Sequence, residues 1–408
     1  MTSVLPEAIT DFITEERCKE TMIALARVPS PQTELLEDEP QLKVFIATAV
    51  EPRLRAMGID NIRRDAMGNL IAELGENVTG RSLMLITNAM NQPQSTMVNA
   101  YAGDVDDGAK YDLPGEVVLG KGVSEQKASM AAMLTAVEAV LKSGIPIKGR
   151  LVVLCCLSGE TGKHDAIRSV VEGEGVRTDI AVIGGQSLIL SMGNRGRIDT
   201  FITVHGNPSH SSKPHEGCDA VTGAMELIRL LRENVDLSRE HPDLGKATMA
   251  ITHLRSFPDS THTIQDRVDL TVDRRLLPGE DPDEAFAVIE GIARRLEGMT
   301  DPASGKNWKV EVRKGPFMYP SLVPPEGPAV RLITESCKEI LGHEPERYYS
   351  PSAFDQGYLN HVGIECVNFG PGEYRFAHTD LDMASVTRTR DAALIHARVI
   401  LRYLNDAP

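Results

Sequence analysis

One short run of the sequence limits the possible folds more than any other. Residues 151–157 read LVVLCCL, without a polar side chain before Ser158. A strand this apolar is covered on both faces, which is typical of a parallel sheet between helices. A second apolar run follows at 180–184, and a segment rich in Ala, Met and Leu at 126–143 predicts a buried helix. The alternation predicts an α/β domain with a helix-covered, mostly parallel sheet.

The pattern changes from about residue 198 onward. We expect strands and helices there in the order β-α-β-β-α-β, a ferredoxin-like α+β arrangement, over residues 199–205, 218–233, 247–255, 264–276, 282–297 and 307–313. After Pro316 the first pattern resumes. The sequence therefore predicts a larger domain made of residues 1–198 and 316–408, interrupted by a smaller domain over 199–315.

The composition argues against several classes of function. The chain of 408 residues has a net charge of −15, whereas a nucleic-acid partner requires concentrated Lys and Arg. It holds no apolar run of about 18 residues, so we expect no membrane span. The six cysteines lack CxxC spacing, and the N-terminus lacks the pattern of a signal peptide. We expect a cytoplasmic protein with reduced, mostly buried thiols and no nucleic-acid or membrane partner.

Polar residues follow the predicted strands at the edge where ligands of α/β sheets collect. Glu125, Glu160 and His378 are three of them. A single Glu after a strand is usually a solvated loop residue or a helix cap, and a single His is usually structural. Two carboxylates and one imidazole at the same rim, however, form a ligand set suited to a transition metal. We therefore predict that these three side chains converge.

Five ordered motifs resemble those of the aminoacylase, carboxypeptidase and desuccinylase family of metal-dependent amidohydrolases. They read GKGVSEQKA at 120–128, GETG at 159–162, GNPSHSSKPHEGCDA at 206–220, HTIQDRVDLTVDRRLLPGE at 262–280 and GPGEYRFAHTDLD at 370–382. The resemblance implies that the larger domain is a catalytic, metal-binding domain. It also implies that the inserted domain, 199–315, forms a homodimer or takes part in a larger homo-oligomer.

Members of this family hold two metals, and the resemblance implies that one position is lost here. The HxDxxP motif reads NAMNQP, so that Asn88 replaces the ligand His. A GEP-like turn reads GGQ, so that Gly185, or Gln186 in the alternative register, replaces an acidic ligand. Glu125, Glu160 and His378 match the ligands of the other metal. We expect one labile divalent transition metal per subunit, Mn²⁺ or Zn²⁺.

A second departure from the family is Gly159, which stands where the resemblance places the general base. Glycine has no side chain for this role, and general acid–base help is worth about 10²–10⁴-fold. Three alternatives stay open. The protein is a non-catalytic binding relative, or it uses a base from elsewhere such as His164 or Arg375, or its substrate is so activated that the metal suffices.

The resemblance also assigns substrate contacts. His210 matches a catalytic His that acts in the partner's site, and Arg275 matches an Arg that binds a substrate carboxylate, which implies a small anionic substrate. His262 and Asn88 stand at two further substrate-binding positions. Without the motifs, His210 would be a turn residue and Arg275 would pair with Asp273 or Asp269 on the strand surface.

These observations favour an altered hydrolase that cleaves a C–N bond in a small carboxylate-bearing substrate. Because Gly159 removes the base, the leading hypothesis is hydrolytic deamination of an activated aromatic amine, such as 5-nitroanthranilate to 5-nitrosalicylate, as in one branch that the chain resembles. The alternative within the same class is an amidohydrolase or deacylase acting on an N-acyl or N-carbamoyl amino acid. The alternative of another class is a non-catalytic small-molecule-binding protein.

Overall fold

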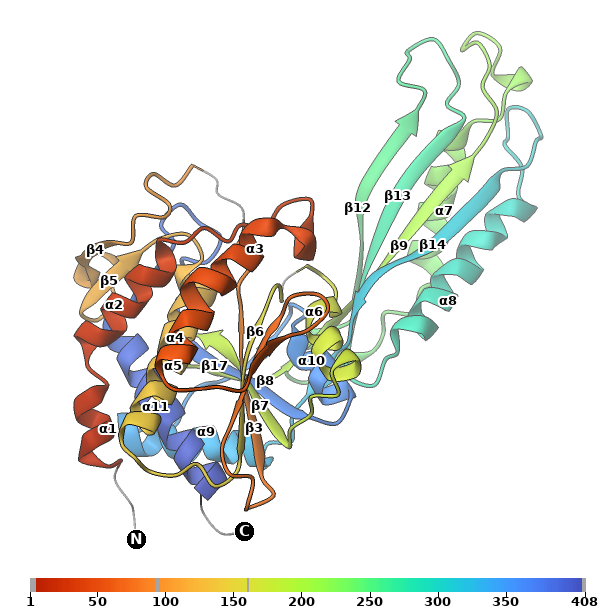
Figure 1. Cartoon of the computed structure of the whole chain (residues 1–408). Coiled ribbons are helices and arrows are strands. Elements are labelled where there is room, and N and C mark those ends of the chain that lie inside the picture. Colours follow the sequence, from red (N-terminus) through yellow and green to blue (C-terminus); the bar gives the residue numbers. More distant parts are fainter. Residues whose placement is uncertain (1–4, 93–95, 160, 406–408) are drawn as a thin grey trace. The chain divides into compact units, whose positions relative to one another are not determined.

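The computed structural model describes residues 5–92, 96–159 and 161–405, and it divides the chain into two compact units (Figure 1). The first unit comprises Met1–Gly193, Leu322–Tyr349 and Tyr358–Pro408. The second comprises Asn194–Ser321 and Ser350–Gly357, so the predicted insertion, 199–315, lies inside it.

A nine-stranded sheet lies at the centre of the first unit, in the order β1-β2-β6-β3-β7-β17-β8-β15, with β16 paired to β8. Its strands are β1 Ile62–Arg64, β2 Leu70–Leu74, β3 Ser82–Asn88, β6 Arg150–Cys156, β7 Ile180–Gln186, β8 Leu190–Asn194, β15 Ser321–Leu322, β16 Arg347–Ser350 and β17 Glu365–Gly372. The central strands β6, β3, β7 and β17 run parallel, so their carboxyl ends meet at one edge.

Helices surround this sheet: α1 Glu7–Phe12, α2 Glu15–Ala26, α3 Pro40–Phe45, α4 Glu51–Ala56, α5 Ala128–Lys142, α6 Asp165–Arg168, α9 Pro328–Leu341, α10 Asp355–His361 and α11 Val386–Asn405. The helix α5 packs on α11 and on the central strands, and most of its residues are buried, as its Ala-rich sequence predicts. The helices α1 and α2 are separate, because the Thr14 side chain accepts a hydrogen bond from Arg17 N and starts α2.

A small second sheet and several short helical turns complete the first unit. A three-stranded sheet contains β4 Asp104–Asp107, β5 Glu116–Leu119 and β18 Met383–Ser385, in the order β18-β5-β4. Single turns of 3₁₀- or π-helix are η1 Leu36–Asp38, η2 Ile46–Val50, η3 Gly108–Tyr111, η4 Val123–Lys127 and η5 Ser169–Gly173. None of the described helices is long and apolar enough to cross a membrane.

The second unit is an antiparallel sheet with two helices on one face. Its sheet follows the order β12-β13-β9-β14, with β9 Gly196–His205, β12 Thr248–Phe257, β13 Arg267–Leu276 and β14 Lys309–Met318. The helices are α7 Ala220–Asn234 and α8 Pro282–Arg294, followed by η7 Arg295–Gly298; η6 Pro214–Glu216 and the short strands β10 Glu240–His241 and β11 Gly245–Lys246 lie in connections. Chain order is β-α-β-β-α-β, as the sequence predicts.

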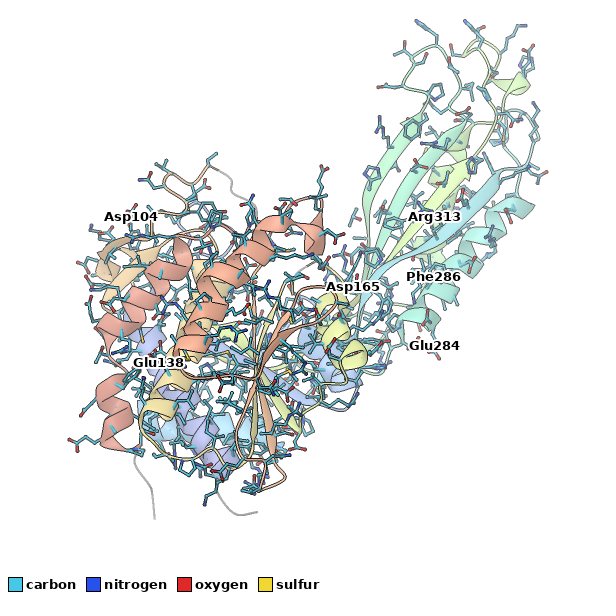
Figure 2. All side chains as sticks on the ribbon, in the orientation of Figure 1. Asp104, Glu138, Asp165, Glu284, Phe286 and Arg313 are labelled. Atoms are coloured by element: carbon cyan, nitrogen blue, oxygen red, sulfur yellow. The ribbon has the colours of Figure 1, made fainter. Side chains whose placement is uncertain are left out.

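Buried and partly exposed residues alternate along the strands of this sheet, which explains why helices cover one of its faces. On β13, Val268, Leu270 and Val272 are buried in the cluster that packs against α7 and α8, while the residues between them stay partly exposed. Figure 2 draws the side chains and labels Arg313 on β14 and Glu284 on α8. The expected fold class, a mixed α/β domain interrupted by a smaller α+β domain, is confirmed.

Candidate functional site

The carboxyl ends of the parallel strands bring the predicted rim together within the first unit. Asn88 at the end of β3 is paired in register with Cys156 at the end of β6, two positions before Ser158. Gln186 at the end of β7 is paired with Gly372 at the end of β17, which leads into the loop that carries His378. Residues far apart in sequence therefore meet at one edge of the sheet.

Glu125 and His378 are in direct contact at this rim. The His378 Nε2 atom lies 2.8 Å from the Glu125 Oε1 atom, and the Glu125 Oε2 atom accepts a long bond, 3.4 Å, from Gln92 N. Glu125 is 4% exposed, whereas the His378 side chain is 51% exposed. The hydrogen bond to Glu125 raises the pKa of His378. The pair combines a buried acidic oxygen with an accessible imidazole.

The local backbone explains how this contact forms. Glu125 lies on the π-helical turn η4, which starts after Gly122 in a left-handed conformation (φ 80°). A Cβ on Gly122 would come within 2.5 Å of the Asn91 side chain, so the turn requires glycine. His378 itself has φ 63°, an uncommon conformation for a residue with a side chain. Unusual backbone on both sides is characteristic of functional sites.

Asp382 fastens the two strained segments to each other. Its carboxylate accepts hydrogen bonds from Gly122 N at 2.7 Å and Ser124 N at 2.8 Å, and its backbone oxygen accepts one from Gly120 N. The side chain is buried, and this burial raises the pKa of Asp382 to about 6. The sequence analysis did not identify this residue, although its place four residues after His378 in the AHTDLD motif was a usable signal.

The Asn88 side chain occupies the space that a side chain at position 159 would need. Asn88 is 5% exposed, and a Cβ on Gly159 would lie only 1.9 Å from an atom of the Asn88 amide. With the amide nitrogen directed toward the turn, Asn88 donates to the oxygens of Ser158 (3.3 Å) and Thr87 (3.2 Å). Its amide is thus bonded to backbone of the rim, and its predicted contact with substrate stays a prediction.

Position 185 has no room for a ligand. A Cβ on Gly185 would approach Phe369 backbone atoms to within 2.8 Å, and backbone cannot move aside as the end of a side chain can. Gln186 carries the nearest side chain, and an amide is a poor metal ligand. The two alternatives for the replaced acidic ligand therefore differ sterically, because only position 186 accepts a side chain as the backbone stands.

Glu160, the third predicted ligand, lies outside the described residues. Within the part of the chain that the structure describes, no group of three or more His, Cys, Asp or Glu side chains is arranged to hold a metal. Glu125 and His378 nevertheless fit part of such a site, because a carboxylate oxygen and an imidazole nitrogen converge at hydrogen-bond distance. The role of Glu160 as a third ligand stays a prediction.

The two suggested substitute bases have other contacts. The His164 ring is 3% exposed and packs on Tyr358, with ring centroids 5.5 Å apart. The guanidinium of Arg375 donates to the backbone oxygen of Tyr111 and lies 3.4 Å from Asp112. These contacts hold Arg375 on the β4–β5 side of the loop. Neither observation supports a role as a base.

In the second unit, Arg275 takes part in an ion-pair network on the sheet. Its Nε and Nη2 atoms donate to both oxygens of Asp273, at 2.8 and 3.0 Å. Arg197 on the neighbouring strand pairs with Asp199 and lies 3.2 Å from Asp273. The simpler alternative for Arg275, a pair with Asp273, is therefore present, and binding of a substrate carboxylate stays a prediction.

His210 and His262 lie on adjacent connections of the second unit. Ser211 N donates to the His262 backbone oxygen at 2.9 Å, and His210 forms a bridge with Thr263. Both residues are exposed, and the His210 Nδ1 atom lies 2.8 Å from Ser212 Oγ. The structure thus brings together two histidines that are 52 positions apart in the sequence.

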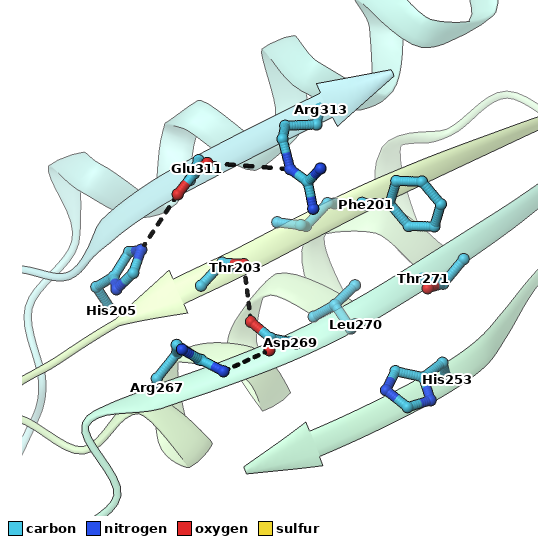
Figure 3. Close-up of a pocket in the computed structure, with 11 residues that line it drawn as sticks. Phe201, Thr203, His205, His253, Arg267, Asp269, Leu270, Thr271, Glu311 and Arg313 are labelled. Atoms are coloured by element: carbon cyan, nitrogen blue, oxygen red, sulfur yellow. Dashed lines mark hydrogen bonds and ion pairs between the residues drawn. The ribbon is translucent and has the colours of Figure 1, made fainter. Parts of the chain in front are cut away.

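The open face of the same sheet carries a polar hollow of about 470 Å³ (Figure 3). Its charged side chains pair with one another: Arg267 with Asp269 at 3.1 Å, and Glu311 with both His205 and Arg313 at 3.7 and 4.0 Å. The hollow holds two arginines and two acidic residues, and His205 adds a positive charge only when it is protonated. We assign it no catalytic role.

Comparison with known proteins bears on the fold and on the second unit. Residues 192–298 match the family model of the peptidase dimerisation domain, M20_dimer. The chain is 24% identical over 311 residues to N-formyl-4-amino-5-aminomethyl-2-methylpyrimidine deformylase of Bacillus subtilis, covering 71% of each chain. It is 24% identical over 267 residues to succinyl-diaminopimelate desuccinylase of Alkalilimnicola ehrlichii, covering 62% of this chain and 67% of that protein.

A solved structure covers almost the whole molecule. The M20 family metallo-carboxypeptidase Sso-CP2 from Sulfolobus solfataricus superposes with a TM-score of 0.74 at 15% sequence identity, covering 95% of this chain and 99% of that one. At this identity the likeness establishes the fold alone. The chain therefore has the fold of the M20 metallo-hydrolases, and the segment that matches the peptidase dimerisation domain lies almost entirely in its second unit.

Proposed function

We propose that this protein is a metal-dependent amidohydrolase that removes an acyl or carbamoyl group from the nitrogen of a small carboxylate-bearing substrate. The observation that carries the proposal is the contact between Glu125 and His378 at the carboxyl edge of a sheet with the M20 fold. The deformylase and the desuccinylase among the relatives both act, by their names, on N-acyl groups. They favour the deacylase alternative over deamination of an aromatic amine.

The surroundings of Gly159 also argue against an aromatic-amine substrate. One way for such a substrate to bind is with its ring in the space left by the missing side chain at position 159. The Asn88 amide occupies this space, because a Cβ on Gly159 would already be 1.9 Å from it. The comparisons do not support the conversion of 5-nitroanthranilate either, so we do not retain it as the leading reaction.

Glu125, His378 and Glu160 would hold one divalent ion, Zn²⁺ or Mn²⁺. When bound, such an ion polarises a carbonyl group and makes water more acidic at neutral pH. The chain itself supplies the framework: Asp382 fixes the turn that carries Glu125, through two N–H bonds of 2.7 and 2.8 Å. Because Glu125 is 4% exposed, its oxygens are held in place before an ion arrives.

Substrate binding is proposed for residues of the second unit. Arg275 donates through Nε and Nη2 to Asp273, so a substrate carboxylate would use Nη1 or displace Asp273. His210, with His262 beside it, would contact the acyl oxygen in the site of a partner subunit, as the family resemblance implies. This arrangement requires a homodimer formed through the second unit.

Hydrolysis of a defined panel tests the proposal. N-formyl, N-succinyl and N-carbamoyl amino acids and 5-nitroanthranilate would be incubated with the purified protein in the presence of Zn²⁺, Mn²⁺ or a chelator. We expect ion-dependent release of the amine from at least one N-acyl substrate, with one ion bound per subunit. Turnover of 5-nitroanthranilate alone, or two ions per subunit, would contradict the proposal. Binding without any turnover would instead favour the non-catalytic relative.

A further inference from the structure

Two atoms of Ser212 contact one nitrogen of the His210 ring. Ser212 N donates a hydrogen bond to the His210 Nδ1 atom at 3.2 Å, and the Ser212 Oγ atom lies 2.8 Å from the same nitrogen. Among the residues that the structure describes, none forms a hydrogen bond or an ion pair with the Nε2 atom, and the residue is exposed. The ring is therefore held through Nδ1 and presents Nε2 to its surroundings.

These contacts determine which ring nitrogen carries the proton. A peptide N–H group is always a donor, so the nitrogen that it faces must be an acceptor. A proton on Nδ1 would point at the hydrogen of Ser212 N, because the two nitrogens are only 3.2 Å apart. The Ser212 hydroxyl can rotate, so it donates to the same nitrogen. In this geometry the ring is the neutral tautomer with its proton on Nε2.

A tight turn places Ser212 against the ring. Lys213 N donates to the His210 backbone oxygen at 2.8 Å, which closes the turn. Ser211 N donates to the His262 backbone oxygen at 2.9 Å and so fastens the turn to the neighbouring connection. Because the backbone of the turn is bonded on two sides, the N–H group that faces Nδ1 has a fixed position.

We propose that Ser212 is a positioning residue that presents the Nε2–H group of His210 as a neutral hydrogen-bond donor to the acyl oxygen of the substrate. The proposal rests on the proposed function, because it assumes that His210 contacts this oxygen. A donor that is already aimed where negative charge develops costs no reorganisation during the reaction. His210 then acts by donating a hydrogen bond and keeps its proton.

The ¹⁵N resonances of the His210 ring test the tautomer directly. In the full chain labelled with ¹⁵N-histidine, at a pH where the ring is neutral, we expect Nδ1 to resonate as an unprotonated nitrogen and Nε2 as a protonated one. The spectrum of His210→Gln identifies the two signals by their absence. The reverse pattern would overturn the proposal. This measurement requires neither an ion nor a substrate, so it does not depend on the proposed function.

Two substitutions of His210 distinguish its nitrogens in the reaction. The amide nitrogen of Gln can reach the place of Nε2, whereas the shorter Asn ends near the place of Nδ1. Loss of one donor to a developing oxyanion costs about 10²–10³-fold in kcat, which we expect for His210→Ala and His210→Asn. His210→Gln should lose less. If His210→Asn is as active as His210→Gln on the best N-acyl substrate, donation from Nε2 is refuted.

Ser211 provides the matched control for Ser212. Its hydroxyl forms no hydrogen bond with a residue that the structure describes, although its backbone N–H donates to His262. Ser212→Ala should lower kcat by about 2–10-fold, the worth of one net hydrogen bond, with little change in KM. Ser212→Thr keeps the hydroxyl and should retain the wild-type kcat, as should Ser211→Ala. Equal losses in the two alanine variants would show a general effect on the turn and refute the role of Ser212.

The outcomes also separate this proposal from its basis. A protein that hydrolyses N-acyl substrates but carries the His210 proton on Nδ1 would refute the positioning role and leave the proposed function intact. A protein that hydrolyses none of them would refute the proposed function, and the role of Ser212 with it, whichever tautomer is found.

Discussion

The two halves of the rim in the first unit differ in the side chains that they hold. In the half formed by Asn88, Gly159 and Gly185, ligand-capable side chains are missing and the space is taken: the Asn88 amide lies against Gly159, and backbone lies against Gly185. In the half formed by Glu125 and His378, a buried carboxylate and an imidazole meet at 2.8 Å and are fastened by Asp382. We call these the filled half and the open half.

The difference predicts that the two halves respond differently to substitution. Where the neighbours have closed over the position, restoring one side chain creates a clash, because protein interiors are close-packed. Where Glu125 and His378 persist, the buried carboxylate contacts the imidazole, and burying a charge is costly unless it is paired. From the contrast we predict one ion position rather than two.

The largest expected effect is on the open half. Glu125→Ala and His378→Ala should each remove ion-dependent turnover, because loss of the ion forfeits several kcal/mol of transition-state stabilisation, or about 10³-fold or more in rate. Glu160→Ala should do the same. The measurements are ion content and kcat on the best N-acyl substrate, with circular dichroism to confirm folding. Wild-type turnover in any of the three would show that the ligand assignment is wrong.

A second effect extends the comparison to the partner subunit. His210→Ala and Glu160→Ala should each be inactive, yet a mixture with exchanged subunits should recover up to about a quarter of the wild-type activity, since half of the dimers are mixed and each holds one intact site. The measurement is turnover before and after subunit exchange. Exchange without recovery would place His210 outside the partner's site.

The pH dependence of stability distinguishes a buried group of the core from one at the rim. His396 on α11 is fully buried, neither ring nitrogen has a hydrogen-bond partner among the described residues, and burial lowers the pKa of His396 to about 4. Below its ordinary pKa near 6.5 the unfolded chain binds the proton and the folded chain does not, so stability falls as the pH decreases from 6.5 to 4. The loss is on the order of 3 kcal/mol.

Asp382 changes the stability in the opposite direction over the same pH range. Its raised pKa of about 6 means that the folded chain takes up the proton first, so stability contributed by the neutral carboxyl group grows as the pH falls from 6 toward 4. With chelator present, His396→Met should make the protein more acid-resistant and Asp382→Asn less so. Denaturant midpoints from pH 7 to 4 measure both; equal slopes in the two variants would contradict this assignment.

The smallest expected effect concerns the filled half. Gly159→Glu should reduce the free energy of unfolding by about 1–3 kcal/mol, as overpacking does, because its Cβ would meet the Asn88 amide. The double variant Asn88→Gly, Gly159→Glu should recover part of this loss. Gly173→Glu is the control, because a Cβ there meets nothing closer than 3.9 Å. Equal destabilisation by the two single variants would remove the argument that position 159 is filled.

The sequence by itself determined the fold class and the order of elements. The apolar run of β6 and the β-α-β-β-α-β pattern after residue 198 predict the observed sheets, because burial on one or both faces of a strand is written in its local periodicity. Motif spacing also pointed to Glu125 and His378, which the structure places in contact. Local pattern and motif order were sufficient for these results.

Only the tertiary structure decided which side chains share a space. Nothing in the local sequence relates Asn88 to Gly159 or Asp382 to Gly122, since each pair joins segments distant along the chain. The Arg275–Asp273 pair, by contrast, could be predicted as an alternative, because residues two apart on a strand lie on the same face. Contacts within an element follow its period, whereas contacts between strand ends depend on how the sheet and its loops pack, and that is a property of the whole fold.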